Sequence, residues 1–253
     1  MKTARDTGLL FQRYTRQMLR NPVWLFVGFS TPVLYLALFT PLLKGLPSTK
    51  ALTTATVLEI FLPGILALLA FTTGSSAGFN TIFELQSGLI ERLRVTPASR
   101  LAILIGPILS AVLMMTIFDT VVVAVAAGFG FSLHWAGLLV LTVLLWALAT
   151  LMAAFSTATA LVTKDISSFA AIINGMNLPL LLLSGVLLPI ALGPLWLRVL
   201  AHFNPLYYLV VASRALAAGH LTAPAVWQAF AVLMPLCVLV LIWATRVFRR
   251  AVS

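Results

Sequence analysis

One pattern in the sequence would, in another setting, carry covalent catalysis. Residues 74–78 read GSSAG, which matches the G-x-S-x-G elbow of serine hydrolases. That elbow needs a turn from a strand into a helix, and its serine needs a histidine within hydrogen-bonding reach. Here the pattern lies in a long apolar run, and His134, His202 and His220 are predicted on the outer side of the membrane, far from it. We interpret the small residues as a helix-packing surface, and we predict no catalytic residue.

Asp119 is the only acidic residue deep within an apolar run. A carboxylate at such a position is a candidate proton carrier. The alternative is a structural hydrogen bond to Thr116, to Thr120 or to a neighbouring helix. The sequence leaves both interpretations open.

Polar side chains in other apolar runs could line a transport path or join two helices. Asn174 and Asn177 are three residues apart and therefore share one face of a helix. Their amide groups need partners inside a membrane. The further candidates for the path or for a dimer interface are Ser30, Thr31 and Asn80.

Cofactor chemistry is not predicted in this chain. Histidines and carboxylates are scattered without metal-ligand spacing, so no metal site is predicted. The single cysteine, Cys237, excludes an intrachain disulfide. No G-x-x-x-x-G-K-[ST] pattern occurs, so the chain has no P-loop of its own for ATP.

The composition predicts an all-α membrane protein with a single transmembrane domain over residues 1–253. The chain is 61% hydrophobic and 9% charged, whereas soluble domains carry about 25% charged residues. Basic residues are not interleaved with exposed aromatic residues, so no nucleic-acid partner is predicted despite a net charge of +10. No signal peptide is predicted. Six spans are predicted at about 23–43, 57–83, 103–130, 136–161, 166–189 and 226–247.

The placement of charge predicts the orientation of these spans. With the N-terminus inside, 12 of the 16 lysines and arginines fall in cytoplasmic segments and 4 fall outside. Cytoplasmic loops carry such an excess, so both termini are expected in the cytoplasm. The loop at 84–100 is then also cytoplasmic.

Two segments outside the spans have their own patterns. Residues 1–22 are predicted to form an amphipathic helix in the membrane interface, with an apolar face and a basic face that carries Arg13, Arg16 and Arg20. Residues 190–224 contain two apolar stretches that are too short to cross, separated at Asn204-Pro205. They are predicted to form an outer re-entrant element that packs over the span bundle.

The cytoplasmic loop at 84–100, ELQSGLIERLRVTPASR, carries both signs of charge within a few residues. A plain loop and a docking surface for another protein both fit this pattern. Glu91 to Arg94 reads as a short helix, and Pro97 ends it because the residue before a proline is pushed out of the α region.

Residues 84–97, ELQSGLIERLRVTP, resemble the cytoplasmic motif of ABC transporter permeases of the type-2 exporter class. The likeness is greatest to daunorubicin-resistance-type drug permeases; nodulation-factor and O-antigen exporters share the fold. NPLYY at 204–208, followed by Arg214-Ala215-Leu216, is similar to the family's stretch before the last span. One departure is the short outer loop at 44–56, which argues against a large outer domain.

The resemblance implies that this chain is a transporter subunit rather than an enzyme. It implies two copies of a separate ABC ATPase subunit, which hold ATP and Mg²⁺, and a second permease chain, expected to be a copy of this one. The coupling residues that it implies are Glu84, Gly88, Glu91, Arg92, Leu93, Arg94 and Pro97; those of the outer element are Asn204, Pro205, Tyr208 and Arg214.

The expected function is export of an amphipathic drug, lipid or glycolipid from the cytoplasm or inner leaflet of a bacterial plasma (inner) membrane. Membrane lipids are then the remaining partner. The alternative is a proton-coupled secondary transporter that uses Asp119. Loss of transport in Asp119→Asn with assembly intact would favour that alternative.

Overall fold

The structure is a computed structural model that describes residues 2–20, 26, 28, 30, 32–34, 37, 38, 54–88, 100–129, 131, 134–186, 190 and 193–252. Its principal elements are α-helices, as the composition predicts. They are α1 (Lys2–Leu19), α3 (Thr54–Gln86), α5 (Arg100–Gly128), α6 (Trp135–Thr163), α7 (Ile166–Leu182), α8 (Leu195–Ala201), α9 (Pro205–Ala217) and α10 (Pro224–Val252).

Four of these helices are long and apolar enough to cross a membrane, in segments 61–86, 102–128, 135–163 and 224–250. A helix rises about 1.5 Å per residue, so each covers the roughly 30 Å of a bilayer core. Helices that can form the predicted second, third, fourth and sixth spans are present at these positions. Most of the predicted first span, 23–43, lies outside the described residues.

The predicted fifth span is shorter than expected. We predicted 166–189, but α7 contains 17 residues and ends at Leu182. Its last turn is followed by Ser184 and by Gly185, which has a positive φ of 75°. This left-handed conformation suits glycine and stops the helix.

The core of the bundle lies where α3 and α6 cross. Gly78 of α3 sits so close to α6 that a Cβ atom on it would lie 2.6 Å from the carbonyl oxygen of Ser156. The Gly78 backbone N–H donates to the Ser156 hydroxyl (3.0 Å), which itself donates to the carbonyl of Ser75. Residues 74–78 lie within the uninterrupted helix α3. The interpretation of GSSAG as a helix-packing surface is confirmed.

α6 and α7 are joined by two residues only. Lys164 ends α6 in a left-handed conformation with φ 54°. Asp165 begins α7, and its side chain accepts hydrogen bonds from the Ser167 hydroxyl and the Ser168 N–H. These bonds stabilise the carboxylate and lower the pKa of Asp165 below its usual range. Asp165 is thus the N-cap of α7.

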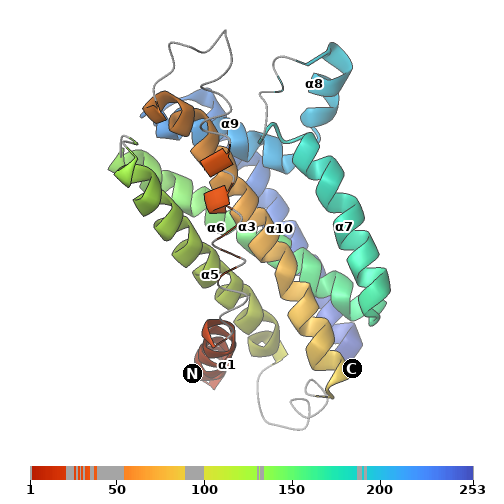
Figure 1. Ribbon diagram of the computed structural model, residues 1–253. Helices are drawn as coiled ribbons and strands as arrows, with labels where there is room; N and C mark the ends of the chain where they lie inside the picture. Colours follow the sequence, from red (N-terminus) through yellow and green to blue (C-terminus); the bar gives the residue numbers. More distant parts are fainter. Residues whose placement is uncertain are drawn as a thin grey trace.

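Figure 1 shows how the helices are arranged. The N-terminus and the C-terminus lie at the same end of the bundle, and α1 lies there against α5. The helices α8 and α9 lie at the opposite end and are bent by 95° relative to each other. The predicted short helices between spans five and six are confirmed. Their placement outside the cell stays a prediction.

Candidate functional site

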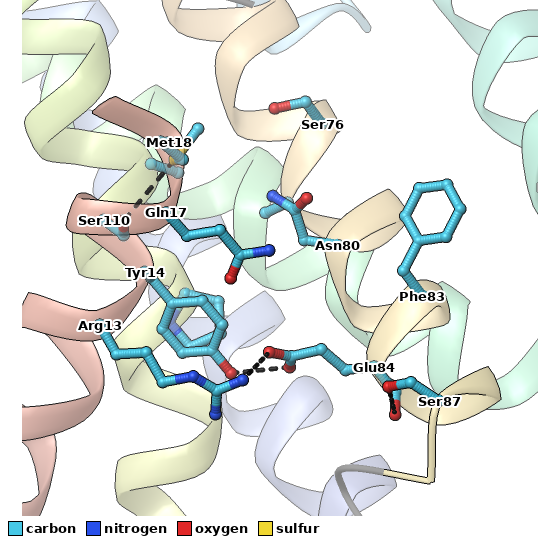
Figure 2. Close-up of a pocket in the computed structure, with 13 residues that line it drawn as sticks. Arg13, Tyr14, Gln17, Met18, Ser76, Asn80, Phe83, Glu84, Ser87 and Ser110 are labelled. Carbon is cyan, nitrogen blue, oxygen red and sulfur yellow. Dashed lines mark hydrogen bonds and ion pairs between the residues drawn. The ribbon is translucent and has the colours of Figure 1, made fainter. Parts of the chain in front are cut away.

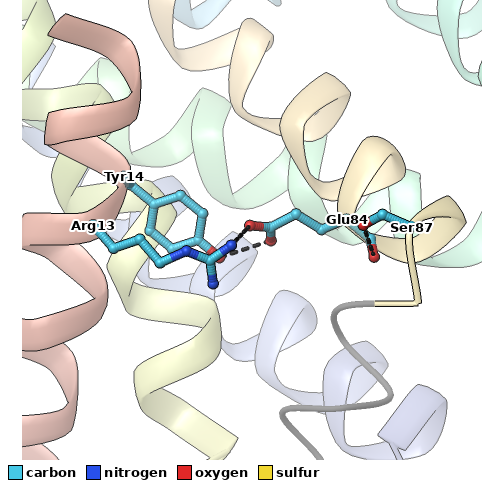
Figure 3. A network of polar contacts seen from close by, with 4 residues as sticks. All are labelled: Arg13, Tyr14, Glu84 and Ser87. Carbon is cyan, nitrogen blue, oxygen red and sulfur yellow. Dashed lines mark hydrogen bonds and ion pairs between the residues drawn. The ribbon is translucent and has the colours of Figure 1, made fainter. Parts of the chain in front are cut away.

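The clearest polar contact between elements links α1 to the end of α3 (Figure 3). The Tyr14 hydroxyl donates to Oε2 of Glu84 at 2.7 Å, and a guanidinium nitrogen of Arg13 lies 3.8 Å from Oε1. Tyr14 is 5% exposed and Glu84 is 9% exposed. Burial, together with the negative charge of Glu84, raises the pKa of Tyr14, so the hydroxyl keeps its proton and remains a donor.

The sequence positions α1 through its apolar face. Leu10 and Tyr14 are one helical turn apart, and both are buried against α5. Gly106 of α5 permits this approach, because a Cβ atom there would lie 3.0 Å from Cβ of Leu10. The predicted amphipathic helix is present. Arg13, Arg16 and Arg20 all lie on its exposed side.

Glu84 lies in a different setting from the one that we predicted. The sequence places it at the start of a water-exposed loop, but α3 continues to Gln86 and the Glu84 side chain turns toward α1. The helix then ends at Ser87, whose hydroxyl donates to the Glu84 carbonyl, and at Gly88, which has a φ of 69°. The other predicted coupling residues, Glu91, Arg92, Leu93, Arg94 and Pro97, lie outside the described residues.

A cavity of about 440 Å³ opens beside this contact, between α1, α3 and α5 (Figure 2). Asn80, one of our path candidates, is in its wall. The lining residues are Arg13, Tyr14, Gln17, Met18, Ser76, Ala77, Asn80, Phe83, Glu84, Ser87, Pro107, Ser110 and Ala111. The cavity therefore combines apolar walls with several groups that can form hydrogen bonds.

Asp119 is not hydrogen-bonded to Thr116 or Thr120, two of the partners that we considered. Its side chain is 8% exposed, and neither carboxylate oxygen has a partner within the part of the chain that the structure describes. The Thr116 hydroxyl instead donates to Val112 and accepts from the Trp146 indole, while the Thr120 hydroxyl donates to the carbonyl of Thr116. The structure does not bring Asp119 together with the α1–α3 contact.

α7 carries the other polar pair. Asn174 is exposed and Asn177 is partly exposed, whereas Phe169 and Ile173 form the buried face of the helix. A Cβ atom on Gly175 would meet nothing within 4 Å. This face of α7 is therefore uncovered in a single copy of the chain. Of the two remaining path candidates, Ser30 is helical and Thr31 lies outside the described residues.

Two side chains of the outer element donate hydrogen bonds to backbone carbonyls near the end of α7. The amide of Asn204 donates to the Leu180 carbonyl at 2.7 Å, and Arg214 donates to the Gly185 carbonyl at 2.6 Å. Leu180 lies in the last turn of α7, where carbonyls have no partner within the helix, and Gly185 lies in the turn that follows. Pro205 occupies the first turn of α9, and the Tyr208 hydroxyl donates to the carbonyl of His202 (3.0 Å).

Replacing Arg214 with methionine should weaken the contact between α9 and the end of α7. The change keeps an apolar side chain but leaves the Gly185 carbonyl without its donor. The free energy of unfolding should therefore fall by about 1–3 kcal/mol. We expect a lower midpoint of thermal unfolding for the purified protein. Arg246→Met, at an exposed arginine of α10, is the matched control and should change the midpoint little. Equal midpoints for both variants would contradict the assigned role.

Sequence reasoning missed three of these contacts. It gave the N-terminal helix an apolar face but did not assign a partner to the Tyr14 hydroxyl. It gave no role to Ser156, and it identified Arg214 without its acceptors. The signals in the sequence are weak, since each is a single polar residue in an apolar segment.

The helices define a multi-pass membrane protein. Its N-terminal helix packs against the bundle at one end, and a bent helix pair lies at the opposite end. The ABC-2 type transporter family model matches residues 5–217. The chain belongs to this family and is a permease subunit, not an enzyme.

Its relatives include proteins that carry the name transport permease ycf38. The protein of Cyanophora paradoxa is 30% identical over 211 residues, which cover 82% of this chain and 72% of the relative. The protein of Porphyra purpurea is 28% identical over 212 residues, which cover 81% of this chain and 71% of the relative.

Proposed function

We propose that this chain is the membrane half of an ATP-driven exporter that moves an amphipathic drug, lipid or glycolipid out of the cytoplasm or inner leaflet. Membership of the ABC-2 family carries the proposal, since permeases of this family work with ABC ATPase subunits. ATP and Mg²⁺ are then bound by the partner subunit. The likeness to daunorubicin-resistance-type permeases supports the substrate class.

In this proposal two ATPase subunits dock, one on each permease chain, at the loop that begins near Glu84. The mixed charges at Glu91, Arg92 and Arg94 provide a surface that a partner with complementary charges can bind in one orientation. The contact between Glu84 and α1 supports the proposal, because it joins the base of α3 to the N-terminal helix next to the docking loop. A movement of the loop would therefore also move α1.

A second copy of the chain is expected to cover the uncovered face of α7. Exposed amide groups at Asn174 and Asn177 would lack partners in lipid, where an unsatisfied polar group is costly. Contact with a second chain, or a polar path between two chains, would satisfy them. We place the assembly in a bacterial plasma (inner) membrane with both termini in the cytoplasm. The charge distribution supports this orientation, as does the position of both termini at one end of the bundle.

The deciding experiment is a pull-down of the tagged chain from native membranes, with ATPase activity measured on the eluate. We expect a P-loop subunit to copurify with the wild-type chain and to be lost from the Glu91/Arg92/Arg94 triple alanine variant. A control variant, Arg246→Ala with Arg249→Ala, removes charge from the end of α10 and should retain the subunit. Recovery of the chain alone, without ATPase activity, would refute the proposal.

The alternative, a proton-coupled transporter, rests on one observation, the buried Asp119 carboxylate that has no hydrogen-bond partner among the described residues. The Asp119→Asn variant separates the two functions. An ATP-driven exporter should keep ATP-dependent transport in this variant. Transport that needs no ATPase subunit and disappears in Asp119→Asn would favour the alternative.

A further inference from the structure

The cavity between α1, α3 and α5 has the size and the chemistry of a ligand site. Its volume, about 440 Å³, lies within the range of roughly 300–1,000 Å³ that is usual for small-molecule pockets. We infer that it binds an amphiphile whose polar group carries no net charge. Naming this amphiphile as the exported substrate rests on the function proposed above, whereas the binding site itself does not.

The first argument is that two side-chain amides face the cavity without hydrogen-bond partners among the described residues. Gln17 of α1 and Asn80 of α3 extend into the space between the two helices (Figure 2). Neither amide has a hydrogen-bond partner among the residues that the structure describes; Gln17 is exposed and Asn80 is partly buried. Asn80 lies within a membrane-crossing segment, where an amide that is left unsatisfied is costly. A ligand with hydroxyl, carbonyl or phosphate oxygens would satisfy both amides.

The second argument is the charge of the cavity. Among the lining residues that the structure describes, the charged ones are Arg13 and Glu84, and they face each other at 3.8 Å. The Tyr14 hydroxyl, which stays protonated, donates its hydrogen bond to the same carboxylate. Arg5, Arg16 and Arg20 do not line the cavity. The described part of the lining therefore has no net charge, and there an anionic or cationic group would enter without a free counter-ion.

The third argument is the apolar part of the wall. Met18 of α1 and Pro107 and Ala111 of α5 are apolar lining residues, and Phe83 is an exposed aromatic ring on α3. Such a wall contacts hydrocarbon favourably. A polar group with an attached acyl or other apolar chain matches this division, while a wholly polar solute does not.

Photo-crosslinking tests the inference on the permease with its ATPase partner in lipid nanodiscs. Three probes carry the same diazirine acyl chain: phosphatidylcholine, which is zwitterionic; glucosyl diacylglycerol, which is neutral; and phosphatidylglycerol, which is anionic. Labelled peptides are quantified by mass spectrometry. We expect at least one of the two probes without net charge to label the cavity peptides several-fold more than phosphatidylglycerol does. The test refutes the inference if phosphatidylglycerol labels equally well or if no probe labels these peptides.

Two variants assign the labelling to the cavity. Asn80→Leu keeps the side-chain volume but removes the amide, and it should lower labelling by the uncharged probes several-fold. Gln228→Leu removes an exposed amide from α10 and should leave labelling unchanged. Equal labelling of both variants would show that the amide does not contribute, contrary to the inference.

Glu84→Gln tests the charge argument within a single sample. The variant keeps an oxygen acceptor for Tyr14 but leaves the Arg13 charge unpaired. We expect the ratio of phosphatidylglycerol to phosphatidylcholine labelling to rise several-fold; an unchanged ratio would contradict the inference. Because the readout is a ratio, it does not depend on the yield of folded protein.

ATPase activity measured on the same nanodiscs separates this inference from the proposed function. Labelling of the cavity without any ATPase activity would support the site and refute the export function. ATPase activity without selective labelling would support the export function and refute the site.

Discussion

Substitution of Gly78 with valine is expected to destabilise the bundle strongly. A Cβ atom at this position would lie 2.4 Å from both the Phe169 ring and the Ser156 hydroxyl, and 2.6 Å from a backbone carbonyl oxygen. A backbone atom cannot rotate away as a flexible side chain can. Overpacking in a closed core costs about 1–3 kcal/mol, and more where the backbone must move. We expect a large loss of monodisperse protein and a lowered midpoint of thermal unfolding.

Gly175→Val is the matched control for this prediction. It places the same side chain in another apolar helix, at a position where a Cβ atom meets nothing within 4 Å. The yield and unfolding midpoint of the single chain should stay close to wild type. Similar destabilisation by both variants would show that valine in a helix, and not the α3–α6 contact, is responsible.

Reversal of the charge at Glu84 is expected to release α1 from the end of α3. Glu84→Lys removes the acceptor of the Tyr14 hydroxyl and places a second positive charge beside Arg13. A hydrogen bond to a charged group contributes about 1.5–3 kcal/mol. The ratio of chains with α1 bound to the end of α3 to chains with α1 released should therefore fall roughly 10-fold to 100-fold. Faster hydrogen exchange of the α1 amides would measure this release.

Tyr14→Phe provides a graded comparison for the charge reversal. It removes one hydrogen bond and keeps the ion pair, which contributes at most about 1 kcal/mol because the Arg13 side chain is 41% exposed. Exchange in α1 should therefore increase less than in Glu84→Lys. Arg16→Ala, at an exposed residue of the same helix, should leave exchange unchanged. If Glu84→Lys also left it unchanged, the contact would not hold α1.

Local patterns in the sequence were sufficient to predict most of the helices. The apolar runs that became α3, α5, α6 and α10 are long and uninterrupted, and a run of this length has few alternatives to a membrane-crossing helix. The basic and apolar faces of α1 follow from the helical period. The small residues at 74–78 indicated close packing, although not the helix that would supply it.

Contacts between distant residues could not be predicted in the same way. Tyr14 and Glu84 are 70 residues apart, and nothing in the period of either helix pairs them. The sequence favoured water as the setting for Glu84, because a carboxylate in lipid is costly. The structure provides a third setting, in which Glu84 accepts a hydrogen bond from Tyr14 and forms an ion pair with Arg13 of α1. The end of α7 was missed because Gly185 stops the helix only through its backbone conformation.

The two-residue joint between α6 and α7 restricts how α7 can move. Two residues span at most about 7 Å, and Lys164 and Asp165 are already fixed by a left-handed backbone and by an N-cap. We therefore expect this joint to oppose a long piston-like stroke of α7 along its own axis relative to α6. A movement relative to α6 would then be a tilt about this joint, and it would carry Asn204 and Arg214 along or break their hydrogen bonds to the far end of α7.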